Sequence, residues 1–168
     1  MKNLVSTFFL VVLLISCEKK QIEFSTLSIK LTDNPGPYDS VLVDIIGVEI
    51  HTDVNGWQSL PTQIGVYDLL LLQNDVDTIL VTPQQIPAGK ISQLRLILGR
   101  YNRVVVGGIS YPLVLSSQDE SGLKLNIHRT LMANTPYILL MDFDATESVH
   151  ITGNDQYKLK PVVRAEFQ

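Results

Sequence analysis

Short runs of alternating apolar and polar residues follow one another along most of the chain. Leu27, Ile29 and Leu31, for example, are separated by single polar residues, which is the period of a strand with one buried face. Further strand candidates occupy the segments 41–50, 78–82, 94–98, 104–106, 109–115, 123–127 and 137–143. Turn-forming glycine, proline and asparagine lie between many of these segments. The chain is therefore predicted to consist mainly of short strands.

The segment 41–50 changes phase once. One apolar set ends at Ile45 on odd positions, the next starts at Val48 on even positions, and Gly47 lies between them. A β-bulge adds one residue to a strand and would keep both sets facing inward. The polar residues that this arrangement turns outward are Asp44, Glu49 and His51.

Two pairs of residues predict tight hairpins. Asn55-Gly56 and Gly107-Gly108 can both adopt the positive φ that two-residue turns require. About nine or ten short strands with turn signals, and no long amphipathic helix, indicate an all-β protein. We expect one antiparallel β-sandwich over residues 26–168. It is either immunoglobulin-like or, because the turn Pro87-Ala88-Gly89-Lys90 resembles turns of those sandwiches, transthyretin-like (prealbumin-like).

Three local patterns refine this expectation. The segment 66–72 fits either a strand or a helical turn. Asp144, followed three residues later by Glu147, fits a capping box at the start of one short helical turn. The segment 159–167 is expected to be a single last strand, in which Pro161 marks an edge or a bulge.

Residues 1–16 have the layout of a secretory signal. Lys2 precedes an uncharged apolar run from Leu4 to Ile15, and the small residue Ser16 ends the segment. In a helix this run would cover roughly 18 Å, too little for a hydrocarbon core of about 30 Å. The run is therefore too short to span a membrane.

The next residue is the only cysteine, Cys17. The four residues Leu14-Ile15-Ser16-Cys17 resemble the lipobox of bacterial lipoproteins. That resemblance implies cleavage before Cys17, acylation of its sulfur (palmitate among the chains), a tether over residues 17–25, and an outer-membrane location in a Gram-negative bacterium. Two or more acyl chains make a lasting anchor. The alternative is an ordinary signal peptide or a membrane-proximal thiol.

Charge and cysteine content argue against several classes. The net charge is −4, and the positive residues are scattered rather than clustered. Nucleic-acid binding depends on clustered Lys and Arg, so a nucleic-acid partner is not expected. With its cysteine acylated, the chain has no thiol for a disulfide or a nucleophile.

Four aspartates are candidate calcium ligands. Asp33 and Asp39 flank a Pro-Gly-Pro loop, and Asp142 and Asp144 are two residues apart on one strand face. Calcium takes six to eight oxygen ligands, which these carboxylates and nearby carbonyls could supply if the two loops meet. The alternative, which we favour, is structural: these side chains cap turns and the short helix.

Aromatic residues near predicted strand ends are candidate contacts for a sugar or a partner protein: Trp57, Tyr38, Tyr101 and Tyr111. Burial in the core is the alternative. The three histidines, His51, His128 and His150, are far apart, and the chain has no His-Glu-x-x-His motif. It also lacks a Gly-x-Ser-x-Gly elbow. We therefore do not expect an enzyme.

A series of motifs resembles one bacterial family, domain of unknown function 4382, over about residues 26–165. The motifs are Leu31-Thr32-Asp33-x-Pro35, Tyr38-Asp39-x-Val41, Gly47-Val48-Glu49-Ile50-His51, Pro87-Ala88-Gly89-Lys90, Leu94-Arg95-Leu96, Gly122-Leu123-Lys124-Leu125, Asp142-Phe143-Asp144-Ala145 and Tyr157-Lys158-Leu159-Lys160-Pro161. The resemblance implies a domain of an envelope lipoprotein and no particular activity.

The sequence thus favours a non-catalytic, lipid-anchored sandwich that binds, adheres or assembles at the cell envelope. Its expected partners are the membrane and an envelope protein or glycan, and no cofactor is expected. A calcium-dependent form of the same module is the first alternative, and an envelope hydrolase is the second.

Overall fold

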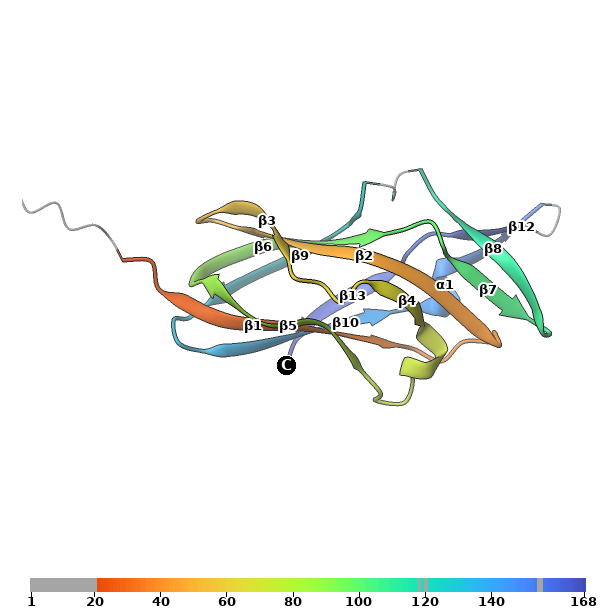
Figure 1. The fold of residues 1–168 in the computed structure, drawn as a ribbon, viewed down its shortest axis with the longest axis horizontal. Coiled ribbons are helices and arrows are strands. Elements are labelled where there is room, and N and C mark those ends of the chain that lie inside the picture. The colour runs from red at the N-terminus through yellow and green to blue at the C-terminus, as the bar shows by residue number, and fades with distance from the viewer. Residues whose placement is uncertain (1–20, 118, 120, 154–155) are drawn as a thin grey trace, which may run out of the picture.

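The computed structural model describes residues 21–168, except 118, 120 and 154–155. Two sheets pack face to face (Figure 1). One sheet has four strands in the order β13 (Val163–Phe167), β10 (Pro136–Phe143), β1 (Phe24–Asp33) and β5 (Thr78–Pro87). The fold is therefore the predicted all-β sandwich.

The second sheet has nine strands. Its main path is β11 (Val149–Thr152), β12 (Gln156–Leu159), β8 (Ile109–Leu115), β7 (Arg103–Val106), β2 (Ser40–Thr52), β6 (Gly89–Leu98) and β9 (Leu123–Leu131). The short strands β3 (Gly56–Leu60) and β4 (Gly65–Asp68) also pair with β2. Two single turns of helix, η1 (Leu69–Leu72) and α1 (Ala145–Ser148), complete the described elements.

The alternating residues of the inner strands make the core. On β1, Leu27, Ile29 and Leu31 are fully buried, as their spacing predicts. From β10, Met141 and Phe143 pack into the same core. At roughly 1.5–3 kcal/mol for each large apolar side chain removed from water, this double layer supplies the main stabilisation of the fold.

The predicted β-bulge lies in β2. The pairing of β2 with β6 skips one residue between Ile45 and Gly47, so Ile46 is the extra residue and is 50% exposed. Val48 and Ile50 return to the buried face. Asp44 lies on the outer face, as predicted, between the inward-facing Val43 and Ile45, but the chain segment that follows β6 covers it and leaves the residue only 7% exposed. Glu49 and His51 are half-buried on the outer face of the sheet.

Other local predictions are also confirmed. Gly107 and Gly108 have φ values of +56° and +77° in the hairpin between β7 and β8. The segment 66–72, predicted to be a strand or a helical turn, contains both: it begins with the end of β4 and continues as η1. The carboxylate Oδ1 of Asp144 accepts the Glu147 N–H at 2.9 Å, which caps the start of α1.

The chain beyond α1 differs from the prediction. Residues 159–167 do not form one strand, because Pro161 lies where the chain leaves β12 in one sheet for β13 in the other. Two pairings, β1 with β10 and β8 with β12, are parallel rather than antiparallel. The described residues contain thirteen strands, more than the nine or ten expected, because several strands have only four residues.

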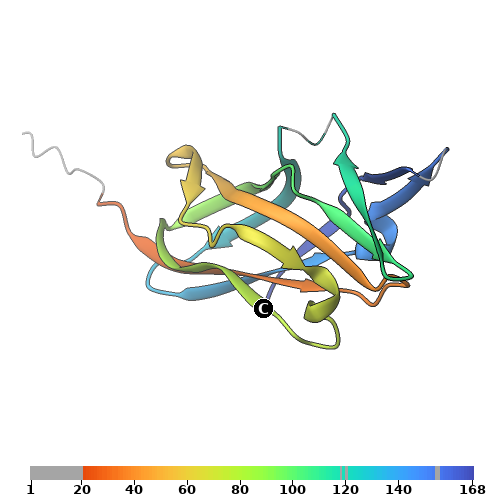
Figure 2. The same ribbon diagram turned by 45° about the vertical axis from the view of Figure 1, so that its right-hand side comes forward.

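The sandwich is elongated, and its two ends differ (Figures 1 and 2). The described chain begins at one end, where β1 starts at Phe24, two residues before the predicted domain boundary. The β7–β8 hairpin and strands β11 and β12 lie toward the opposite end. The start of β1 is therefore far from that second end.

Candidate binding groove on the nine-stranded sheet

The turn 99–102, between β6 and β7, is held by a buried polar network. The Asp44 backbone N–H donates to Oδ1 of Asn102 at 2.8 Å, and Nδ2 of Asn102 donates to the Gly99 carbonyl at 2.8 Å. Oδ2 of Asp44 accepts the Tyr101 N–H at 3.1 Å. Because Asp44 and Asn102 are only 7% and 2% exposed, these hydrogen bonds fix the turn strongly.

Gly99 makes this close packing possible. A Cβ atom at this position would lie 2.0 Å from Oδ2 of Asp44, far inside van der Waals contact. Every larger residue would therefore displace the carboxylate that holds the turn. This close approach, rather than backbone conformation, is what requires glycine here.

The fixed turn presents Tyr101 to solvent, with 77% of its surface exposed. Beside it lies a groove of about 490 Å³ on the outer face of the sheet. We call this the outer-face groove; its lining residues are Ile46, Leu98, Gly99, Arg100, Asn102, Pro112, Leu113, Val114 and Leu115. The exposed parts of Ile46 and Val114, at 50% and 59%, make much of its wall apolar. A concave site with apolar walls and a few polar groups is a candidate for ligand binding.

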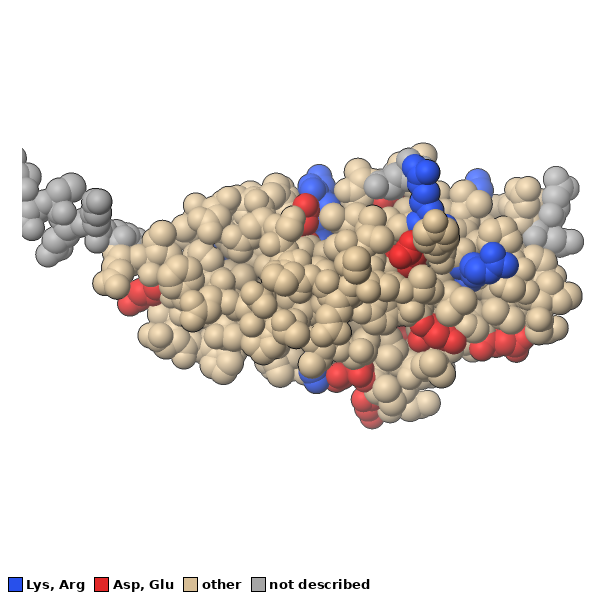
Figure 3. Space-filling view, in the orientation of Figure 1, with Lys and Arg blue, Asp and Glu red and all other residues tan. Residues whose placement is uncertain are grey.

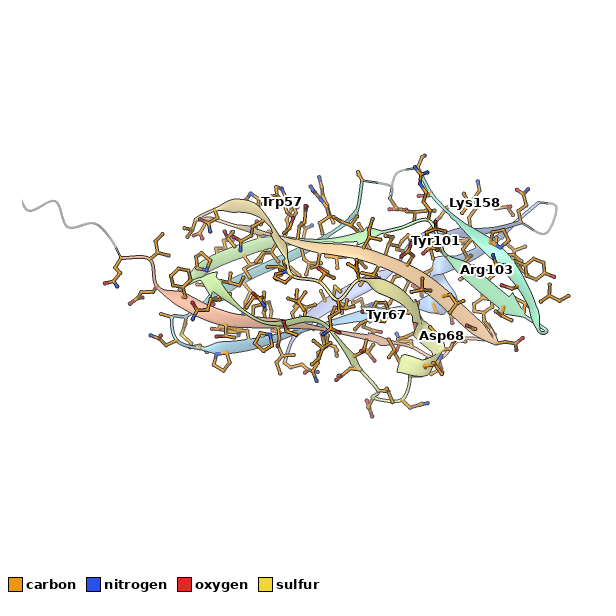
Figure 4. All side chains as sticks on the ribbon, in the orientation of Figure 1. Trp57, Tyr67, Asp68, Tyr101, Arg103 and Lys158 are labelled. Carbon is orange, nitrogen blue, oxygen red and sulfur yellow. The ribbon has the colours of Figure 1, made fainter. Side chains whose placement is uncertain are left out.

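Cationic side chains border the outer-face groove. Arg100 belongs to its lining, Arg103 pairs with Pro112 across β7 and β8, and Lys158 of β12 pairs with Val114. Arg103 is oriented by Ser110, whose Oγ accepts from its Nε at 2.7 Å. Figure 4 places Tyr101, Arg103 and Lys158 in the same half of the molecule, with Trp57 in the other half.

The structure brings Asp33, Asp142 and Asp144 to the paired ends of β1 and β10, whereas Asp39 lies against the β7–β8 hairpin. No group of three or more His, Cys, Asp or Glu residues in the described part of the chain is placed to hold a metal ion. Asp39 instead accepts the Gly108 N–H at 2.8 Å, and Asp144 caps α1. Asp142 Oδ2 accepts from Nδ2 of Asn34 at 3.2 Å. These bonds correspond to the structural alternative.

Asp33 is the most perturbed of the four. Its side chain is 96% buried at the end of β1, and Oδ1 accepts the Ala145 N–H at 2.9 Å. Burial raises the pKa of Asp33 from 3.8 to about 6, against the opposing effect of that hydrogen bond. The carboxyl group thus links β1 to the start of α1 by a hydrogen bond, while its burial disfavours the ionised form.

The family of the chain follows from a comparison with known domains. The profile of Domain of unknown function (DUF4382) matches residues 24–161. The chain belongs to this family. No curated protein and no solved structure matches it. The DUF4382 match begins at the first residue of β1 and ends after β12, so it includes the whole outer-face groove.

The four candidate aromatic contacts of this DUF4382 domain lie in different settings. Tyr38 and Tyr111 are half-buried and pack against the core. Tyr111 lies 5.0 Å from Tyr157 between ring centroids, and burial raises the pKa of Tyr38. Trp57 is half-buried, with the Arg95 guanidinium 4.2 Å from its ring centroid. Tyr101 is therefore the candidate whose ring is most available to a ligand.

The histidines are dispersed, as their spacing suggests. Nδ1 of His51 lies 2.8 Å from Oγ of Ser92, while His128 and His150 are exposed. Cys17 and the predicted signal lie outside the described residues. Among residues that the structure does describe, no helix has the length and apolarity to cross a membrane.

Sequence reasoning found Tyr101 but missed the groove beside it. The groove unites residues from β2, the turn 99–102 and β8, which are far apart in the sequence. One available signal was Ile46. This apolar residue belongs to neither of the two alternating apolar sets of β2 that face the core, so it must lie on the outer face. The run Gly99-Arg100-Tyr101-Asn102 was a second signal of a tight, exposed turn.

Proposed function

We propose that this DUF4382 chain is a lipid-anchored, non-catalytic binding module of the cell envelope. Its anchor is the acylated Cys17, in the outer membrane of a Gram-negative bacterium, and its binding surface is the outer-face groove. The observation that carries the proposal is the exposed ring of Tyr101, carried beside an apolar groove by a turn whose backbone is held by buried hydrogen bonds.

An exposed aromatic side chain on an ordered turn favours binding for a physical reason. The turn is already ordered by Asp44 and Asn102, so little conformational entropy is lost when a ligand contacts Tyr101. Tyrosine presents a large apolar ring together with a polar hydroxyl, which suits partly hydrated ligands. The position of the groove also supports presentation, because the described chain begins at the other end of the sandwich (Figure 1).

The anchor is tested by metabolic labelling of the full chain with an alkyne analogue of palmitate. The label should enter the wild-type chain, which should fractionate with membranes. Cys17→Ser should lose both properties. The anchoring would be contradicted if Cys17→Ser were still labelled and membrane-bound. It would also be contradicted if the wild-type chain were soluble.

Binding is tested with the full chain in lipid nanodiscs, co-sedimented with purified cell envelopes. Tyr101→Ala should weaken binding about tenfold or more, since central aromatic contacts are worth roughly 2 kcal/mol. Phe24→Ala is the matched control, because Phe24 is an exposed aromatic (43%) near the start of the described chain. Equal loss in both variants, or in neither, would argue against a site at Tyr101.

A further inference from the structure

The backbone around the outer-face groove is already hydrogen-bonded. Strand β8 lies between β7 and β12. Strand β2 pairs on one edge with β6 and β7 and on the other with β3 and β4. A peptide that adds a strand needs a free sheet edge, and neither strand offers one. A ligand on this face is therefore recognised by side chains rather than by backbone pairing.

The side chains of the groove suit flat rings with hydrated edges. Val114 and Ile46 present methyl surface to solvent, above a floor that includes the buried Leu98 and Leu113. Tyr101 is not part of this lining, but it lies in the chain between two lining residues, Arg100 and Asn102, and its exposed ring adds aromatic surface at the rim. A pyranose ring has one or two faces of C–H groups that can lie on such surface, while its hydroxyl groups stay in water at the edges. The open shape of the groove leaves those edges hydrated.

The charge around the groove is positive although the chain as a whole is acidic, at −4. Within the described part of the chain, the ion pairs are Lys30 with Asp77 and Arg95 with Glu49. None of the cations at the groove is in this set; they are Arg100, Arg103 and Lys158. Figure 3 shows Lys and Arg side chains on the upper part and the right-hand half of this view, with Asp and Glu side chains among and below them.

Two carboxylates of the same sheet, Asp44 and Asp68, do not pair with these cations. Asp44 accepts the Tyr101 N–H and is 7% exposed. Asp68 accepts the hydroxyl of Ser40 at 2.8 Å and the N–H of Val41 at 3.3 Å. Arg103 donates from Nε and Nη2 to the hydroxyl and carbonyl of Ser110, which occupies one edge of its guanidinium and leaves the other edge. That edge and the Arg100 guanidinium can bind a carboxylate from outside in a planar, two-point geometry.

We infer that the outer-face groove binds a polysaccharide of uronic acids, with sugar rings on Tyr101 and carboxylates at Arg100 and Arg103. This inference rests on the proposed function and adds the class of ligand. Each feature is needed: the aromatic and methyl surface selects rings, the cations select carboxylates, and the closed backbone excludes an added strand.

The test is equilibrium binding of the full chain in nanodiscs to polygalacturonate oligomers, measured by biolayer interferometry. Methyl-esterified oligomers of the same length keep the rings and remove the charge. Poly-glutamate keeps the charge and removes the rings. Polygalacturonate should bind at least tenfold more tightly than either, and its affinity should fall as salt is raised.

Variants locate the binding. Tyr101→Ala and Arg100→Gln should each weaken polygalacturonate binding at least fivefold. Phe24→Ala and Arg164→Gln, an exposed arginine on the other sheet, should change it less than twofold. Both groove side chains are exposed, so circular dichroism spectra and melting curves should match those of the wild type.

Three results would overturn the inference: equal binding of the acid and its ester, equal binding of poly-glutamate, or binding indifferent to Tyr101. The envelope experiment separates the two levels of the proposal. Tyr101-dependent binding to envelopes without binding to polygalacturonate would reject the ligand class and keep the binding module. Loss of both would reject the groove as a binding site.

Discussion

Gly99→Ala tests whether the buried network fixes the turn that presents Tyr101. The new Cβ would lie 2.0 Å from Oδ2 and 2.5 Å from Cγ of Asp44, so the carboxylate must move by more than 1 Å to reach contact distance. That movement breaks its hydrogen bond to the Tyr101 N–H, which is 3.1 Å long in the wild type. The substitution therefore combines overpacking with a lost charge-assisted hydrogen bond.

The expected magnitude follows from those two effects. Overpacking costs about 1–3 kcal/mol, and a hydrogen bond to a charged group contributes about 1.5–3 kcal/mol. Partial relaxation of the turn reduces the sum, so we expect the free energy of unfolding to fall by about 2–4 kcal/mol. For a domain of this size, that lowers Tm by roughly 4–16 °C.

The assay is urea unfolding followed by the fluorescence of Trp57, the only tryptophan. Gly153→Ala is the matched control, because a Cβ there meets no atom within 4 Å. Polygalacturonate binding by Gly99→Ala should fall as it does for Tyr101→Ala, since the turn that carries the ring loses its fixed position. If Gly99→Ala were as stable as Gly153→Ala, the network would not hold the turn as described.

Three further outcomes follow. Asp33 has a pKa of about 6 in the folded state against 3.8 in the unfolded state, so the folded state binds its proton more tightly. The free energy of unfolding therefore falls as pH rises between these values. Asp33→Asn should abolish this fall of about 3 kcal/mol, measured by unfolding from pH 4 to 7. Gly108→Ala, at a φ of +77°, should cost about 1 kcal/mol in urea unfolding, whereas Gly153→Ala should cost less than half of that. Ile46→Ser should weaken polygalacturonate binding severalfold while Tm stays within about 2 °C, because surface substitutions change stability by about 0.5 kcal/mol or less; a large loss of stability would mean that Ile46 is a core residue.

Local sequence patterns predicted the local structure well. The phase change at Gly47 located the bulge, and Gly107-Gly108 located a hairpin, because both features depend on neighbouring residues alone. The sandwich followed from the number and length of the apolar segments. The cap at Asp144 was also readable, since its partner is three residues away.

Contacts between distant segments were not predictable in the same way. Asp44 looks like an outward-facing polar residue until the turn 99–102 closes over it, and that turn is more than fifty residues away. The parallel pairing of β1 with β10 joins segments about 110 residues apart. Pro161 signalled an interruption, but nothing local shows that the chain changes sheets there.

In the candidate site, too, residue types were predictable from the sequence, whereas contacts between distant segments were not. Tyr101 was recognisable as an aromatic residue near a strand end, while its groove depends on the packing of β2 against the turn and β8. The aspartates were recognisable as possible ligands, yet each is engaged by a backbone or amide N–H group of its own. Residue type suggested the candidates, and only the tertiary structure separated an exposed candidate for binding from residues that cap turns and helices.

The most direct test of the account is a crystal structure of the protein grown with trigalacturonate. The account predicts electron density for a sugar ring against Tyr101, with a carboxylate within hydrogen-bond distance of Arg100 or Arg103. Density for the trisaccharide at Trp57 or on the four-stranded sheet, with the outer-face groove empty at saturating ligand, would contradict it.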